Sequence, residues 1–264
     1  MGLLVLFMVG FCFLLAFVGG ANGMIMPLPQ DYGRVMIRNF SGQAGLGAVR
    51  FDHWLHRAFY TCRLCHVDIG FAMEANATKI KAETNMKGFH CGSCHNGTRA
   101  FGSKMIFPAC SLSAAPEDSG CSRCHSVGKK SRKEYDYVSF TEKLPRKGVW
   151  RLIDWEEAEV RGFIQPIDFL PGVSIVRPPL TAQKDFSIAS ASSGWMSDII
   201  FSHKKHALWN GCEVCHPDIF PSVKKGTLKY SMFQICDGQY CGVCHDHVAF
   251  PLNDCQRCHV NPVR

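Results

Sequence analysis

Charged residues are absent from the first 23 positions of the chain, which are rich in leucine, phenylalanine and valine. The missing lysine or arginine departs from the basic start of a typical secretory signal. Positions 2–20 are nevertheless almost unbroken apolar sequence, and Ala21 and Gly23 supply the small residues of a cleavage site. We therefore predict a signal peptide at residues 1–23.

An uncleaved membrane anchor is the alternative, because the apolar run is close to the minimum length of a spanning helix. A lipoprotein signal does not fit, since Cys12 lies inside the run directly after Phe11. No second apolar run of this length follows in the sequence. After cleavage of the signal we expect no membrane span.

The most informative pattern is the pentapeptide Cys-x-x-Cys-His, which occurs six times. Two cysteines at this spacing form thioethers to one porphyrin, and the adjacent histidine ligates the iron from the proximal side. Zinc is the alternative for paired cysteines, but zinc does not require a histidine in the same place every time. We predict six covalently bound heme c groups, numbered 1 to 6 along the chain. The six copies are Cys62, Cys65 and His66; Cys91, Cys94 and His95; Cys121, Cys124 and His125; Cys212, Cys215 and His216; Cys241, Cys244 and His245; Cys255, Cys258 and His259.

This cofactor content limits the fold and the compartment. Six hemes on 264 residues leave 44 residues for each, too few to build an ordinary apolar core around every porphyrin. The hemes must serve as much of the core, so we expect mostly coil with short α-helices and little or no β-structure. Because c-type heme is attached outside the bacterial cytoplasm, we expect a periplasmic protein, with an extracellular or outer-membrane-associated location as the alternative.

The basic character of the polypeptide does not indicate a nucleic-acid partner. The formal net charge is +7 and the isoelectric point about 8.7. Twelve heme propionates would bring the total to about −5, with buried propionates able to stay protonated. We therefore expect the lysines to offset propionates, and we expect no nucleic-acid binding.

A repeat with an offset of 150 positions organises the chain. The first two heme motifs recur at this offset without a gap, and the third motif follows sooner in the second copy. The predicted organisation is a lead at 24–47, a first triheme unit at 48–126 (unit 1), a connector at 127–197 and a second triheme unit at 198–264 (unit 2). The repeated segment before each first motif is Phe51-Asp52-His53-Trp54-Leu55-His56 and Phe201-Ser202-His203-Lys204-Lys205-His206.

The connector carries no heme motif and is not of low complexity. It begins with the basic run 129–133, and residues 149–163 are predicted to form a short helix. Four later prolines favour extended or turn structure. We expect a strap packed over both units, and a docking surface for a partner is the alternative.

Six histidines remain as candidate distal ligands, a number that permits bis-histidine iron in every heme without requiring it. Spacing favours His53 and His56, together with their counterparts His203 and His206, because residues three apart can diverge from one helical turn toward two porphyrins. The third heme of each unit is less clear, since His90 aligns with Tyr240. The six histidines outside the motifs are His53, His56, His90, His203, His206 and His247.

Methionine is the other ligand of heme iron to be considered, and it raises the reduction potential. Met232 precedes Cys241 by nine positions and is favoured for the third heme of unit 2, with His247 as the competitor. In unit 1, Met86 and His90 remain open alternatives. A methionine beside a heme otherwise packs on the porphyrin.

Together these motifs resemble the triheme class III cytochromes of the c-seven type. The resemblance covers both units and implies a tandem duplication of that fold. It implies that His53 and His203 ligate the first heme of each unit, and that His56 and His206 ligate the second. Fused members often use one His-Met heme per unit, which points to Met86 and Met232. Family members transfer electrons in the periplasm or outside the cells of metal- and sulfur-respiring bacteria.

Two cysteines remain once the motifs and the signal are accounted for, Cys110 and Cys236. They lie in different units, so a disulfide between them would pin the units together. Two unpaired thiols are the default expectation.

We expect an electron carrier rather than an enzyme. Its partners would be other cytochromes, membrane oxidoreductases or terminal reductases. A small-molecule reductase is the alternative, and it needs an open distal site or a lysine-ligated heme. All six motifs end in histidine, so only the third heme of each unit can be open. A filament-forming conductive cytochrome is a further alternative, compatible with the duplication.

Overall fold

The computed structural model describes residues 28–110, 121–125, 136–148, 151–181, 183–190, 195–221 and 229–260. The predicted signal peptide and the basic run 129–133 lie outside the described residues. Most of the described chain is coil, with short helices and four antiparallel two-stranded hairpins. This confirms the predicted fold class. Among these ranges, no helix has the length and apolar character that crossing a membrane requires.

Unit 1 is built on a hairpin that feeds directly into a helix. β1 (Arg34–Ile37) pairs with β2 (Val49–Asp52) with Val35 opposite Phe51, and α2 (His53–Arg57) follows without a break. The hairpin therefore draws part of the predicted lead into unit 1. The other elements are η1 (Gly42–Ala44), the π-helical turn η2 (Leu64–Asp68), α3 (Ala82–Met86), η3 (His90–Ser93), β3 (Ala100–Phe101), β4 (Lys104–Met105) and α4 (Cys121–Cys124).

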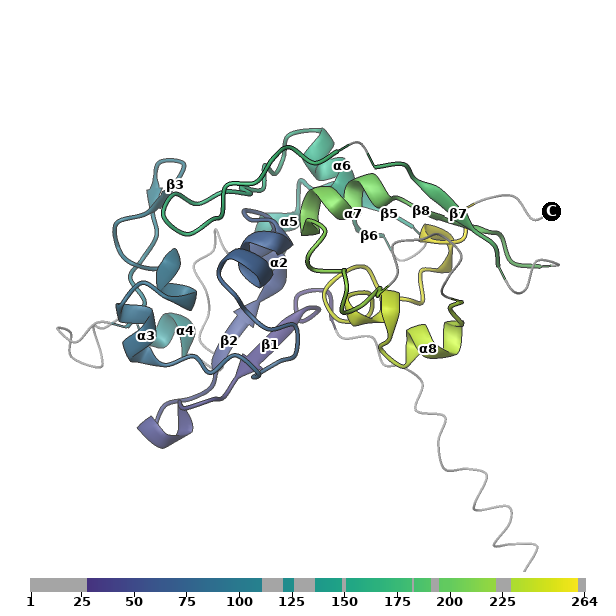
Figure 1. Cartoon of the computed structure of the whole chain (residues 1–264). Coiled ribbons are helices and arrows are strands. Elements are labelled where there is room, and N and C mark those ends of the chain that lie inside the picture. The colour runs from purple at the N-terminus through teal and green to yellow at the C-terminus, as the bar shows by residue number, and fades with distance from the viewer. Residues whose placement is uncertain are drawn as a thin grey trace, which may run out of the picture.

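Unit 2 repeats this plan (Figure 1). Its hairpin takes one strand from the connector, since β7 (Phe186–Ile188) pairs with β8 (Ile199–Phe201). α7 (His203–Asn210) follows the hairpin, as α2 follows the first. The remaining elements are α8 (Met232–Cys236), η5 (Tyr240–Val243) and η6 (Cys255–Arg257). α3 and α8, like η3 and η5, lie 150 positions apart, the offset of the sequence repeat.

The glycine of the second motif in each unit has a steric reason. A Cβ at Gly92 would overlap the backbone carbonyl oxygen of Asn85, and a Cβ at Gly242 would overlap that of Ile235. Each motif is thus pressed against the short helix that precedes it, at a separation that only glycine permits. The two units share this close contact.

The connector packs across both units, along one side of the molecule in Figure 1. It contains α5 (Tyr137–Thr141), the hairpin of β5 (Arg146–Lys147) with β6 (Leu152–Ile153), and α6 (Trp155–Val160). α6 is shorter than the helix predicted over 149–163. The Asp154 side chain accepts a hydrogen bond from the Glu157 amide and so begins the helix at residue 155. Positions 149–150 lie outside the described residues.

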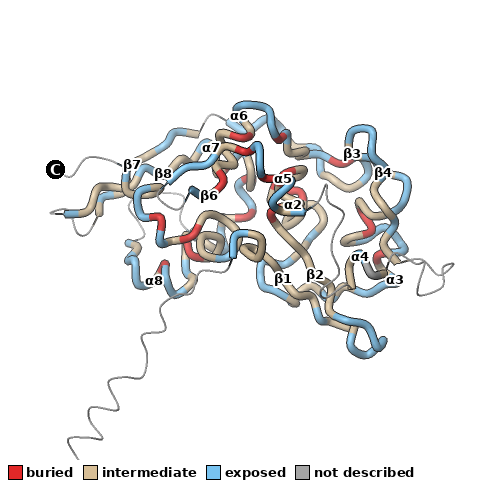
Figure 2. The backbone as a smooth tube through the Cα atoms, turned by 180° about the vertical axis from the view of Figure 1, so that it is seen from behind, coloured by how far each residue is buried: buried red, intermediate tan, exposed pale blue. Residues whose placement is uncertain are grey.

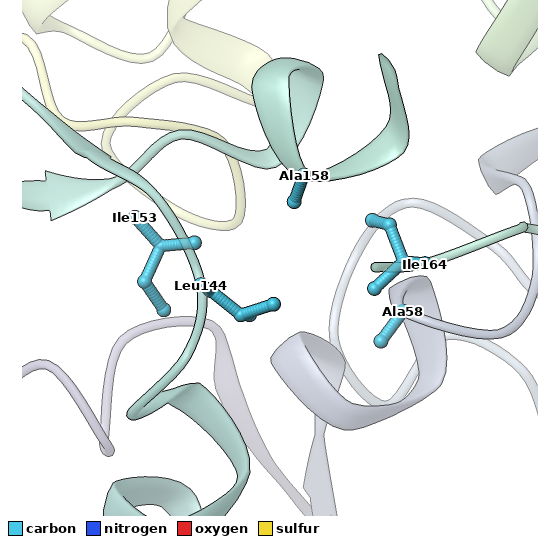
Figure 3. Close-up of a cluster of buried hydrophobic side chains, with 5 residues drawn as sticks. All are labelled: Ala58, Leu144, Ile153, Ala158 and Ile164. Carbon is cyan, nitrogen blue, oxygen red and sulfur yellow. The ribbon is translucent and has the colours of Figure 1, made fainter. Parts of the chain in front are cut away.

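A small cluster of buried apolar side chains joins unit 1 to the connector. Leu144, Ile153, Ala158 and Ile164 of the connector meet Ala58, directly after α2 (Figure 3). Backbone hydrogen bonds continue this contact, because the Thr61 amide donates to the carbonyl of Ile167. The connector is therefore part of the packed structure.

The connector is bonded to unit 2 as well. The indole Nε1 of Trp209, on α7, donates to Glu159 of α6 at 2.8 Å. Lys205 forms an ion pair with Glu156 on the same two helices. Arg257, in η6, donates to the backbone carbonyl of Lys147 at 3.2 Å. These bonds place the connector over both units, as a strap would lie.

The polypeptide's own apolar core is small. In the described ranges only eleven hydrophobic residues are buried, and Figure 2 shows that buried residues of all kinds form short separate stretches. A chain of this length normally buries a larger continuous core. Groups other than side chains must therefore supply much of the packing between its segments.

Candidate heme-binding site

All six proximal histidines are oriented in the same way. In each, Nδ1 lies within hydrogen-bond distance of a backbone carbonyl oxygen, so that Nδ1 carries the proton and Nε2 is left as the metal ligand. The carbonyls differ in origin, because some follow the motif closely and others are distant in sequence. The Nδ1 to oxygen distances are 2.9 Å for His66 to Phe71, 3.1 Å for His95 to Phe107, 2.7 Å for His125 to Gly47, 2.6 Å for His216 to Phe220, 3.0 Å for His245 to Phe250 and 2.6 Å for His259 to Ser197.

Three of the four favoured distal histidines are oriented by the same kind of bond. His53 Nδ1 lies 2.7 Å from the carbonyl oxygen of Gly33. His56 and His206 each bond the carbonyl four residues earlier, in the first turn of the helix, at 3.1 and 2.8 Å. Their Nε2 atoms are likewise left for a metal.

Three of the proximal histidine rings each face the ring of one distal histidine. The ring centres of His53 and His66 lie 6.4 Å apart and their planes are nearly parallel, at 4°. The pairs His56–His95 and His206–His245 have centres 6.3 and 6.4 Å apart, with planes tilted by 56° and 51°. A metal–imidazole nitrogen distance of about 2 Å puts two opposed imidazole rings on one metal with centres roughly 6 Å apart. These separations suit the two axial ligands of one iron.

The fourth expected pair is not brought together. His203 is the first residue of α7, as His53 is of α2, but its ring contacts Phe186 and Phe201 at 6.0 and 5.8 Å. Among the ring contacts of the described residues, His203 and His216 do not form a pair. The ligand of heme 4 stays a prediction.

Electrostatics keep the paired histidines neutral. Burial lowers the pKa of His56 to about 4, and the hydrogen bond that the ring donates to the Asp52 carbonyl acts in the opposite direction. Burial also lowers the pKa of His245 to about 4. Neutral imidazole is the form that ligates metal, so both side chains are ready to ligate at neutral pH.

The third heme of each unit has a different environment. A hollow of about 450 Å³ lies beside the sixth motif and is lined by Cys255, His259, Trp195 and Met196 among others. Met232 is not among the described residues that line it and is about half exposed on α8. Sequence reasoning missed Met196, because the repeat aligns it with Leu46 and nothing near a motif marks it.

The contacts of the two candidates in unit 1 involve other residues than those of the third motif. Met86 lines a hollow of about 270 Å³ with His95, the proximal histidine of heme 2. The His90 ring packs against Phe71 at 5.7 Å, and its buried Nδ1 has no hydrogen-bond partner. Neither observation places a ligand on heme 3, so both assignments stay predictions.

The cysteines and several buried donors fit covalent heme. Cys110 and Cys236 do not form a disulfide with each other in the described ranges. Cys110 lies instead near Cys91 and Cys124, and its charge contributes, after burial, to the raised pKa of each of those thiols. The buried donors Tyr32 Oη, Trp54 Nε1, Arg63 Nε and Arg99 Nε lack protein partners.

Repeated thioether motifs, anchored proximal histidines and opposed distal rings define a multiheme cytochrome c, a class whose function is electron transfer. The family model for cytochrome c7 and related cytochrome c matches residues 49–126 and 199–260. Both units are covered, so the chain belongs to the family of cytochrome c7 and related cytochromes c. It binds heme covalently and exchanges electrons with redox partners.

Solved structures of multiheme cytochromes are also similar in sequence. The C-terminal hexaheme fragment of GSU1996 is 22% identical over 86% of this chain and 96% of its own, with a TM-score of 0.25. The N-terminal hexaheme fragment is 21% identical over 87% and 99%, with a TM-score of 0.26. The dodecaheme cytochrome c GSU1996 is 21% identical over 86% and 74%, with a TM-score of 0.27. Comparison with curated proteins found no match.

Proposed function

We propose that this chain binds six hemes and carries electrons from heme to heme in the bacterial periplasm, in anaerobic or metal- or sulfur-dependent respiration. Its electron partners would be other cytochromes, membrane oxidoreductases or terminal reductases. The observation that carries the proposal is the set of three opposed imidazole pairs at 6.3 to 6.4 Å. Export is supported by the apolar segment at residues 1–23 and by the thioether motifs.

The residues explain how the chain would do this without a substrate. Heme, when bound, supplies an iron that changes between two oxidation states. Each opposed pair would hold one iron through its two Nε2 atoms, and the Nδ1 bonds to backbone carbonyls keep the two rings in place. Rings held in this way would move little when an electron is gained or lost. The remaining task of the protein is to set potentials through ligand type, burial and nearby charge.

The first experiment is a heme count on the purified protein, followed by the visible spectrum of the reduced form with and without carbon monoxide. We expect six hemes and little change from hemes 1, 2 and 5. Replacing His56 or His206 with alanine should add one CO-reactive heme each. Lys205→Ala, on the same helix as His206, is the matched control and should add none. A fully CO-reactive parent protein would contradict the proposal.

A reductase is the second candidate, and one observation favours testing it. The rings of His125 and His259 are not opposed by a second imidazole in the described part of the chain. A CO response confined to hemes 3 and 6 would lead to assays of nitrite and peroxide reduction. Turnover abolished by CO would support the reductase, whereas no turnover would leave electron transfer as the function.

A further inference from the structure

The two units meet at their first heme motifs. Arg177 of the connector bridges them, with Nη1 2.7 Å from Asp68 of unit 1 and Nε 2.9 Å from Glu213 of unit 2. Asp68 ends the turn that carries Cys65 and His66, and Glu213 lies inside the fourth motif. One arginine therefore links the first motif of unit 1 to the first motif of unit 2.

A second contact shows how close these motifs are. A Cβ placed on Gly211 would lie 2.5 Å from Cδ of Arg63, which belongs to the first motif. The thiols of Cys215 and Cys244 also feel the charge of Cys62, in addition to burial, and the pKa of each is raised. The first motif thus lies beside the fourth and fifth motifs at the unit boundary.

Arg57 lies at this boundary. Its guanidinium carbon is 4.8 Å from the ring centre of Trp155, in α6, and 5.6 Å from that of Trp209, in α7. Arg57 itself ends α2, so its charge lies where unit 1, the connector and unit 2 come together. Stacking on two indoles holds the guanidinium in place.

The position of Arg57 brings its charge close to heme ligands on both sides. It directly follows His56, and Trp209 follows His206 by three residues on α7. Its charge lowers the pKa of His245, after the larger effects of burial and of His206. It also opposes the burial that raises the pKa of Cys62.

One carboxylate acts on Arg57 without forming an ion pair with it in the described part of the chain. This is Glu159 of α6, which accepts a hydrogen bond from Trp209. Burial lowers the pKa of Arg57, but an arginine side chain stays protonated in proteins. The equivalent position in unit 2 is the buried Ala207. The positive charge of Arg57 is therefore found at the unit boundary and is not repeated in unit 2.

We propose that Arg57 raises the reduction potential of heme 1 and heme 5, the hemes at the unit boundary. An electron would then be held preferentially at the place where the two units exchange electrons. This rests on the proposed electron-transfer function. A fixed positive charge beside heme disfavours the ferric state, which is one charge more positive than the ferrous state. The effect is large where the surroundings are partly dry, because the local dielectric constant is low.

The test is a spectroelectrochemical titration of holoprotein carrying Arg57→Leu, with Arg57→Lys keeping the charge. We expect Arg57→Leu to lower the reduction equilibrium constant of one or two hemes about tenfold, which is about 59 mV for one electron. Arg57→Lys should retain most of the parental curve. Arg161→Leu, an exposed arginine at the end of α6, is the control for net charge and should shift nothing.

Glu159→Gln provides a second variant with the opposite sign. The amide still accepts the Trp209 bond but carries no charge, so the same hemes should become easier to reduce. If Arg57→Leu does not retain its hemes, the midpoint potentials of Glu159→Gln are the test of the proposal. Unchanged midpoint potentials in Glu159→Gln and in Arg57→Leu with all hemes bound would overturn the proposal. Equal shifts in Arg57→Leu and Arg57→Lys would also overturn it. A parent protein without six hemes would instead contradict the proposed function.

Discussion

The two triheme units share the order of a hairpin and the helix that follows it but orient their first distal histidine differently. His53 and His203 each begin a helix directly after a hairpin, at positions 150 apart. In unit 1 the carbonyl of Gly33 accepts from both the amide and the ring of His53, and the ring opposes His66. In unit 2 the side chain of Asp185 instead accepts from Ser202 and from the amide of Lys204. The position of a histidine in the helix therefore sets where its imidazole lies. The carbonyl that accepts the Nδ1 proton sets which way the ring is oriented.

The largest expected difference from the parent protein comes from removing a thioether cysteine in either unit. Cys62→Ala and Cys212→Ala should each leave the protein with one heme fewer, measured by intact mass and by heme absorbance. The unit 1 variant should be the less stable of the two, because Cys62 is partly buried at the boundary whereas Cys212 is exposed. An unchanged heme count in Cys62→Ala would make the heme assignment wrong.

The motif glycines test whether the units share their backbone in solution. Gly92→Ala and Gly242→Ala should each lower the free energy of unfolding by about 3 kcal/mol, since the new methyl group must displace backbone. Gly42→Ala, where nothing lies within 4 Å, is the control, and chemical denaturation is the measurement. A large effect in one unit only would show that the units differ here.

Arg177 tests the tie between the units. Arg177→Ala removes the partner of Asp68, whose side chain is fully buried, and should cost about 2 kcal/mol of unfolding free energy. Glu213→Ala should cost less, because the Glu213 side chain is 46% exposed. A double-mutant cycle with Asp68→Ala measures the coupling. Additive effects would mean that the ion pair contributes no stability.

Trp209→Phe makes unit 2 resemble unit 1, where the equivalent residue is Phe59. The variant keeps an aromatic ring over Arg57 and loses only the hydrogen bond to Glu159, at 2.8 Å. We expect a loss of about 1 kcal/mol in thermal or chemical unfolding, with heme content unchanged. A loss of heme would show that Trp209 supports heme 5 and does more than tether the connector.

Features that repeat locally were predictable from the sequence, and contacts between distant segments were not. The family, the coil-rich fold and the spacing of His53 and His56 follow from motifs a few residues long. The carbonyls that bond His125 and His259 belong to Gly47 and Ser197, 78 and 62 positions away. No periodicity or composition marks such an acceptor, because every residue carries a carbonyl.

The contribution of the segments that flank each unit could not be predicted from short sequence patterns either. β1 and β7 lie in the predicted lead and connector, yet each completes the hairpin of a unit. Met196 lines the hollow of the sixth motif from a position that the repeat aligns with an ordinary leucine. In each case a tertiary contact, set by how the segment packs, decides the role of the residue.

The bonds of His125 to Gly47 and of His259 to Ser197 bear on the order in which the protein matures. Each bond joins the last heme motif of a unit to a residue two positions before its second hairpin strand, so the third motif is bonded back to the hairpin that begins the unit. Under the proposed export from the N-terminus, Gly47 would leave the cytoplasm long before His125. The bond between them would then form only when the third motif arrives. Unit 1 would therefore gain this bond before unit 2 gains its own.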